Sequence, residues 1–101
     1  MVYTAANTGI KPAVLEEIAC LAEKNDIERV ILFGSRARGD YRRESDIDLA
    51  VRGGDPERFR LALEEETSTL LRFDVIDLNH PLQSALLEAI RKEGCLIYEK
   101  V

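Results

Sequence analysis

Residues 33–51 have the sequence FGSRARGDYRRESDIDLAV, and this stretch decides how the rest of the chain is interpreted. A Gly-Ser pair ends one apolar run, and Asp46 and Asp48 stand one residue apart in the next. Because side chains alternate along a strand, both carboxylates are expected on one face, with Cα atoms about 6.5–7 Å apart. Like charges in a partly dry site raise each other's pKa, so the pattern favours a bound cation.

The residues around this stretch predict alternating helices and strands. Helical spacing of apolar residues predicts a first helix over 11–24 and a last helix over 82–90. A second helix is predicted to begin after Asp55 as its N-cap, with one apolar face that continues to Leu70. Apolar runs predict strands at 28–34, 45–51 and 72–78, and residues 95–101 can add an edge strand. Residues 35–39 are expected to form a short helical turn. The connection between the first two strands is short for a parallel crossover. We therefore expect one α+β domain over 1–101, with a mixed sheet of about three to four strands and helices packed on it.

Gly34 and Ser35 supply the chemistry that complements the carboxylates. A glycine at a strand end lets backbone approach a ligand closely, and a following helical turn directs free N–H groups at an anion. The Ser35 hydroxyl adds a donor, so this corner suits the phosphates of a nucleoside triphosphate. Two Mg²⁺ ions about 3.5–4 Å apart, held by Asp46, Asp48 and a third carboxylate, would activate a hydroxyl and stabilise pyrophosphate.

This paired motif carries a family resemblance. Gly34-Ser35, a ten-residue spacer and Asp46-Ile47-Asp48 resemble the nucleotidyltransferase superfamily that includes DNA polymerase beta and the aminoglycoside nucleotidyltransferases. The longer strings GSRARG and SDIDL are similar to its smallest branch, the minimal or MntA-like nucleotidyltransferases, over nearly the whole chain. The resemblance implies catalytic, metal-binding roles for Asp46 and Asp48. It implies substrate binding by Gly34, Ser35 and Arg38.

The third carboxylate has two candidates in the segment FDVIDL. The family pattern has an aspartate that opens a later strand, and Asp74 fits that position, whereas Asp77 follows three residues later. Residues three apart on a strand point to opposite faces, so only one of the two can join the site. We favour Asp74 as the third catalytic and metal-binding residue.

The resemblance also implies a function. It implies Mg²⁺-dependent transfer of a nucleoside monophosphate, AMP from ATP or another nucleotide, to a hydroxyl acceptor. Relatives in the minimal branch are commonly encoded with a HEPN-domain toxin and resemble its antitoxin, so a HEPN partner, a second copy of the chain, or both are expected to complete the pocket. The alternatives are a binding antitoxin without turnover and a nucleotide-sensing module.

Composition and charge restrict which partners and which cellular location we expect. The net charge of −5 argues against general nucleic-acid binding, and no apolar run approaches the ~20 residues of a membrane span. No secretory signal opens the sequence, so a cytoplasmic location is expected. Cys20 and Cys95 have no metal or redox spacing and are interpreted as reduced core thiols.

Several other polar residues near the motif have no assigned role. Arg36, Arg42 and Arg43 could contact phosphates or an acceptor, although exposed arginines more often solvate a surface. His80, in the predicted turn LNHP, is expected to be a surface residue rather than a base.

Overall fold

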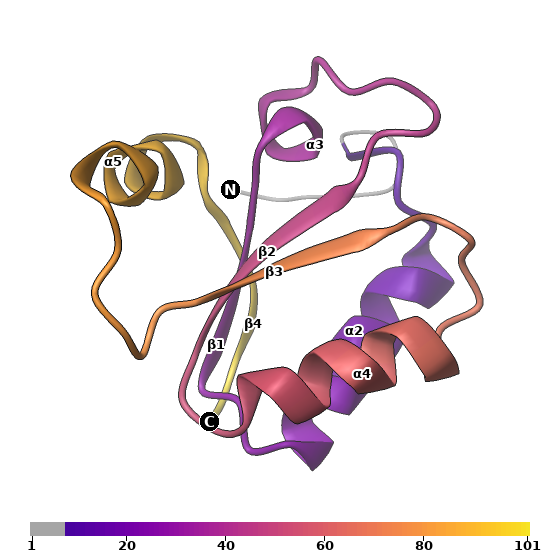
Figure 1. Cartoon of the computed structure of the whole chain (residues 1–101). Helices are drawn as coiled ribbons and strands as arrows, with labels where there is room; N and C mark the ends of the chain where they lie inside the picture. Colours follow the sequence, from indigo (N-terminus) through magenta and orange to yellow (C-terminus); the bar gives the residue numbers. More distant parts are fainter. Residues whose placement is uncertain (1–7) are drawn as a thin grey trace.

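The computed structural model describes residues 8–101, and their four strands form one mixed sheet in the order β3-β2-β1-β4 (Figure 1). β1 (Arg29–Phe33) is antiparallel to both β2 (Ile47–Arg52) and β4 (Cys95–Glu99). β3 (Phe73–Asp77) is parallel to β2. The predicted mixed sheet and the antiparallel first pair are therefore confirmed.

Helices cover both faces of this sheet (Figure 1). α2 (Pro12–Lys24) and α4 (Pro56–Glu66) lie together on one face. α5 (Ser84–Glu93) lies on the other, and the single turn α3 (Ser35–Arg38) follows β1 directly. Among residues 8–101 no helix has the length and apolar character needed to cross a bilayer.

The alternation of β2 decides which face each side chain serves. Ile47, Leu49 and Val51 are fully buried in the cluster beneath α2 and α4. Ala50 points the other way and is buried under α5 with Ile90. Asp48 shares this second face, so the α5 side of the sheet carries the acidic motif.

Two expectations about the fold are wrong. The second helix does not continue to Leu70, because α4 ends at Glu66 and the next residue, Thr67, takes an extended conformation. Leu70 is consequently fully exposed in the loop before β3. Cys20 is exposed rather than in the core, since it lies outside the stripe through which α2 packs, whereas Cys95 is buried as predicted.

Candidate active site

The acidic site is built from the register between β2 and β3. Asp48 and Asp74 are direct partners across this parallel pair, so their side chains share one face on strands about 4.8 Å apart. Asp77 lies three residues further and faces the other side. Its carboxylate accepts the backbone N–H of Asn79 at 2.8 Å and lies 3.5 Å from His80 Nε2. The structure thus brings Asp74, and not Asp77, to Asp48.

Burial and neighbouring negative charges both act on the Asp48 carboxylate. Partial burial raises the pKa of Asp48 from 3.8 to about 6, and the charges of Asp74 and Asp46 add to the effect. Glu93 on α5 also raises this pKa, while the Arg38 guanidinium opposes the rise. Asp46 is exposed just before β2 begins. The three predicted carboxylates therefore act on one another, and Asp48 is the member at the centre.

Gly34 makes room for Asp48. It lies between β1 and α3 with φ 78° and ψ −158°, a backbone conformation that residues other than glycine avoid. Its neighbour Phe33 is the cross-strand partner of Asp48. A Cβ at Gly34 would overlap the Asp48 carboxylate oxygen Oδ2. The glycine is thus required both by the turn and by the close approach of the carboxylate to the backbone.

Ser35 opens α3 beside this carboxylate. The carbonyl of Gly34 accepts the N–H groups of Ala37 and Arg38 at 3.1 and 3.0 Å, which closes the single helical turn. The first N–H groups of such a turn have no acceptor within it. Ser35 is half-buried and directly follows Gly34, whose backbone approaches the Asp48 carboxylate. The corner can accept an anionic group next to the carboxylates.

Arg38 is engaged in ion pairs. Its guanidinium donates to Asp40 at 3.2 Å and to Glu93 at 3.0 Å, and the side chain is 43% exposed. These bonds raise its pKa further. Arg38 therefore links the end of α3 to α5 at the rim of the acidic site, where it is near enough to Asp48 to affect its pKa.

Arg36 has a role that the sequence interpretation missed. It is 1% exposed, and its guanidinium lies 4.9 Å from the ring centroid of Tyr41. Its bond to Ser45 fixes the backbone immediately before Asp46. No local pattern in the sequence shows this role, because the carbonyls that the guanidinium reaches include one 28 residues away. The Arg36 side chain donates to the backbone carbonyls of Thr8 (2.8 Å), Ser45 (3.1 Å), Arg43 (3.2 Å) and Arg42 (3.5 Å).

The other polar residues near the motif remain at the surface. Arg42 and Arg43 are exposed and contribute backbone carbonyls to Arg36. The side chain of His80 is 77% exposed, so its predicted surface position is confirmed.

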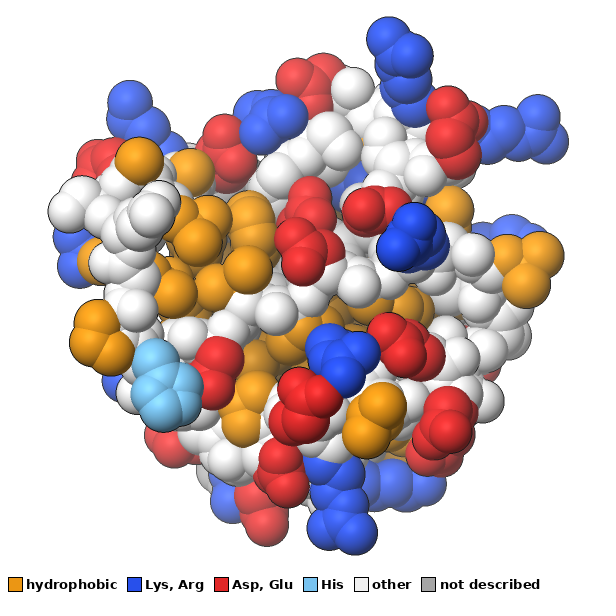
Figure 2. Space-filling model, in the orientation of Figure 1, with side chains coloured by type: hydrophobic (Ala, Val, Ile, Leu, Met, Phe, Trp, Pro, Cys, Tyr) orange, Lys and Arg blue, Asp and Glu red, His pale blue; other side chains and the backbone are white. Residues whose placement is uncertain are grey.

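The donor set fits a hard divalent cation. Carboxylate oxygens are the protein ligands that Mg²⁺ prefers, and a cation would offset both the burial and the neighbouring negative charges that raise the pKa of Asp48. Within residues 8–101, no three acidic, histidine or cysteine side chains already converge as a complete ligand set. In Figure 2, acidic side chains nevertheless gather near the middle of the view, with hydrophobic side chains between them and α5 at the left. Asp46, Asp48 and Asp74 are the residues that would hold the ion.

This fold and this site define a nucleotidyltransferase core. Residues 16–101 match the family model described as "Polymerase beta, Nucleotidyltransferase", and the chain belongs to that family. The predicted resemblance to the minimal nucleotidyltransferases is confirmed by the relatives described next.

The first of these relatives is a protein of Methanocaldococcus jannaschii named protein adenylyltransferase (MJ0604). It is 41% identical over 66 residues, which cover 63% of this chain and 64% of the relative. The match thus spans less than two thirds of that curated protein.

Two solved structures share the fold. A crystal structure of a toxin-antitoxin with AMP-PNP aligns with a TM-score of 0.67 at 25% identity, and covers 85% of this chain and 73% of that one. A variant of the MntA-HpeT toxin-antitoxin aligns with a TM-score of 0.66 at 23% identity over the same shares, and that likeness concerns the fold alone.

Proposed function

We propose that this protein transfers AMP from ATP, with two Mg²⁺ ions, to a hydroxyl group of a partner protein in the cytoplasm. The observation that carries the proposal is the placement of Asp48 and Asp74 in register beside the Gly34-Ser35 corner. Carboxylates that hold metal ions and a backbone corner that accepts phosphate are the two parts that nucleotidyl transfer needs.

Each residue of the site has a role in this scheme. The acceptor oxygen forms a bond to the α-phosphorus of ATP, and the bond from that phosphorus to the departing pyrophosphate breaks. Asp74, the exposed member of the in-register pair, takes the proton of the acceptor hydroxyl. Ser35 and the backbone at Gly34 hold the pyrophosphate oxygens. Bound Mg²⁺ supplies charge neutralisation and lowers the pKa of the acceptor hydroxyl, and Asp46, Asp48 and Asp74 would hold it.

The nature of the acceptor is proposed from the relatives. The curated relative is named protein adenylyltransferase, and a solved neighbour at 25% identity is a toxin-antitoxin with AMP-PNP. These names support a protein acceptor and an adenine nucleotide. We propose a HEPN-domain toxin as that acceptor, so that this chain acts as the antitoxin by modifying it.

Intact-mass spectrometry tests this proposal. The purified protein is incubated with ATP, Mg²⁺ and a HEPN-domain protein as the proposed acceptor. We expect the partner to gain one or more AMP units with the wild type and with Asp77→Asn, whose carboxylate faces away from the site. The double variant Asp46→Asn/Asp48→Asn should leave the partner unmodified. A stable complex with no added mass would contradict the transfer and favour a binding antitoxin.

A further inference from the structure

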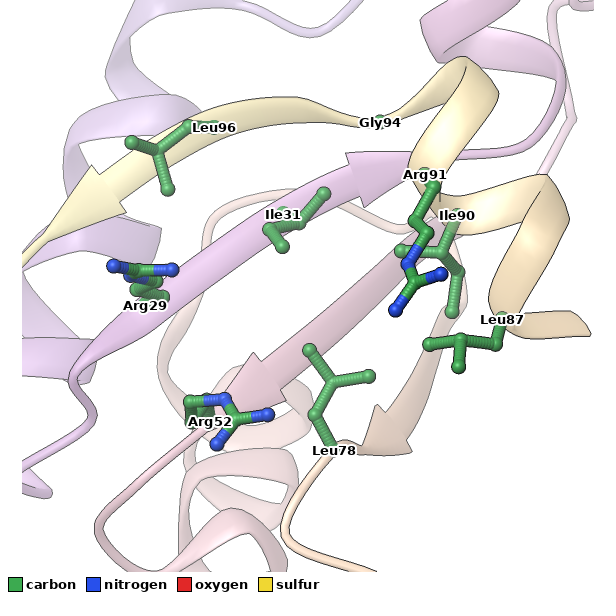
Figure 3. A pocket seen from close by; sticks show the side chains of 9 residues that line it. All are labelled: Arg29, Ile31, Arg52, Leu78, Leu87, Ile90, Arg91, Gly94 and Leu96. Atoms are coloured by element: carbon green, nitrogen blue, oxygen red, sulfur yellow. The ribbon is translucent and has the colours of Figure 1, made fainter. Parts of the chain in front are cut away.

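A second feature of the α5 face lies at the other end of the strands. A hollow of about 390 Å³ opens between α5 and the sheet (Figure 3). It receives side chains from β1, β2, β4 and α5 and from the residue after β3. Cross-strand partners Phe33 and Asp48 mark the acidic end of the sheet, and partners Arg29 and Arg52 mark this end. The two sites therefore share one face, about 13 Å apart along β1.

Three arginines surround this hollow. Arg29 and Arg52 stand directly opposite each other on neighbouring strands, and Arg91 extends from α5 toward them (Figure 3). Arg29 has a counterion in Glu99, at 3.2 Å. Arg52 and Arg91 have no side-chain hydrogen bond or ion pair with any residue of the described chain, 8–101. Like charges directly opposite on a sheet are destabilising, so an added anion at Arg52 and Arg91 would relieve the repulsion.

The lining between the arginines is aliphatic. Ile31, Leu78, Leu87 and Leu96 line the hollow, and Leu96 is 48% exposed. An apolar centre with arginines around it has the composition of a protein-protein interface. None of the lining residues is aromatic, so the hollow offers no stacking surface for a nucleic-acid base.

We propose that this hollow docks an acidic segment of the partner protein, which inserts an aliphatic side chain between the arginines and places carboxylates on Arg52 and Arg91. The inference rests on the proposed function in one respect, that the acceptor is a protein. A partner held here lies on the same face as Asp48, so a segment extending along the sheet reaches the transfer site.

The test measures affinity by isothermal titration calorimetry, with the HEPN-domain protein as the ligand. Arg52→Glu/Arg91→Glu should weaken binding about tenfold or more, because charge reversal replaces attraction with repulsion. The matched control is Lys24→Glu/Arg58→Glu, which changes net charge equally but lies on α2 and α4 on the opposite face. The control should stay within about threefold of the wild type.

A second pair of variants tests the apolar centre. Leu96→Ser should also weaken binding, whereas Leu61→Ser, equally exposed at 45% on α4, should not. Circular dichroism melting establishes that each variant is folded. Agreement of both pairs with these expectations supports the docking surface.

The outcomes separate this inference from the proposed function. Asp48→Asn should lose transfer and still bind the partner. If the wild type binds the partner through the arginines but transfers no AMP, the result supports the surface and counts only against the activity. Absence of wild-type binding, equal losses in test and control variants, or no loss in either would overturn the inference. Arginine-dependent binding of a single-stranded RNA, with partner affinity unchanged, would overturn it as well.

Discussion

Asp48 on β2 and Asp74 on β3 occupy matching positions across a parallel strand pair, and both face the side of the sheet that carries α5. The chain has placed two carboxylates where an ordinary sheet would place apolar or neutral side chains. Burial of Asp48, together with the charges of Asp74 and Asp46, raises its pKa to about 6 in the ion-free protein. Such a cost in stability is typical of sites selected for function.

We predict that Asp48→Asn stabilises the ion-free protein at pH 7. Asparagine keeps the shape of the side chain and removes the repelled charge. Solvent screens this half-buried group, so the gain should be about 1–2 kcal/mol, or several degrees in melting temperature. Calorimetry in EDTA measures it. Asp77→Asn is the control and should give no gain, because Asp77 accepts the N–H of Asn79; equal gains would contradict the account.

The contribution of Asp48 to the free energy of unfolding should change with pH in one direction. The pKa of Asp48 is about 6 in the folded protein and 3.8 without its surroundings, so between these values the folded state binds more protons than the unfolded state. The free energy of unfolding of the wild type, relative to Asp48→Asn, should therefore fall as pH rises from about 4 to 6 and level off above. Urea titrations in EDTA across this range measure the slope. A rising difference would contradict the assignment, and saturating Mg²⁺ should abolish the fall.

Gly34→Ala should abolish nucleotide transfer and destabilise the fold. The new methyl group would displace the Asp48 carboxylate, and φ of 78° adds strain of about 1–3 kcal/mol. Gly39→Ala is a matched control, since Gly39 also has positive φ, 93°, but its Cβ would enter open space. The control should lose stability and retain transfer activity, measured as pyrophosphate release. Equal activity in the two variants would show that the close approach at Gly34 is irrelevant.

Arg36 should behave as a structural residue. Arg36→Met fills a similar volume but removes the guanidinium that donates to the carbonyls of Thr8 and Ser45. We expect a loss of about 2–4 kcal/mol in the free energy of unfolding from urea denaturation. Arg42→Met, at an exposed position, should change it by less than about 0.5 kcal/mol. A small effect at Arg36 would contradict its role in holding the segment before Asp46.

The sequence predicted the parts of this molecule that follow from local rules. Alternation along 45–51 placed Ile47 and Asp48 on opposite faces, and the short connection after Ser35 excluded a parallel crossover. The same alternation showed that Asp74 and Asp77 could not both reach one site. These arguments need only strand geometry, and the structure agrees with them.

The sequence could not predict features set by contacts between distant residues. Arg36 is buried because carbonyls from segments up to 28 residues away converge on it, and no local pattern shows that convergence. The pairing of Arg38 with Glu93 spans 55 residues. Leu70 was assigned to a helical face on spacing alone, although the backbone leaves the helix at Thr67. Arg52 and Arg91 likewise meet only through the packing of α5 on the sheet.

The most direct test of adenylyl transfer follows the phosphorus atoms of ATP. The protein, Mg²⁺ and the proposed HEPN-domain acceptor are incubated with ATP labelled at either the α- or the γ-phosphate, and label on the acceptor is counted after denaturing electrophoresis. We expect label from the α-phosphate alone. This label should disappear with Asp46→Asn/Asp48→Asn and persist with Asp77→Asn. Label from the γ-phosphate, or none from either, would contradict adenylyl transfer by this site.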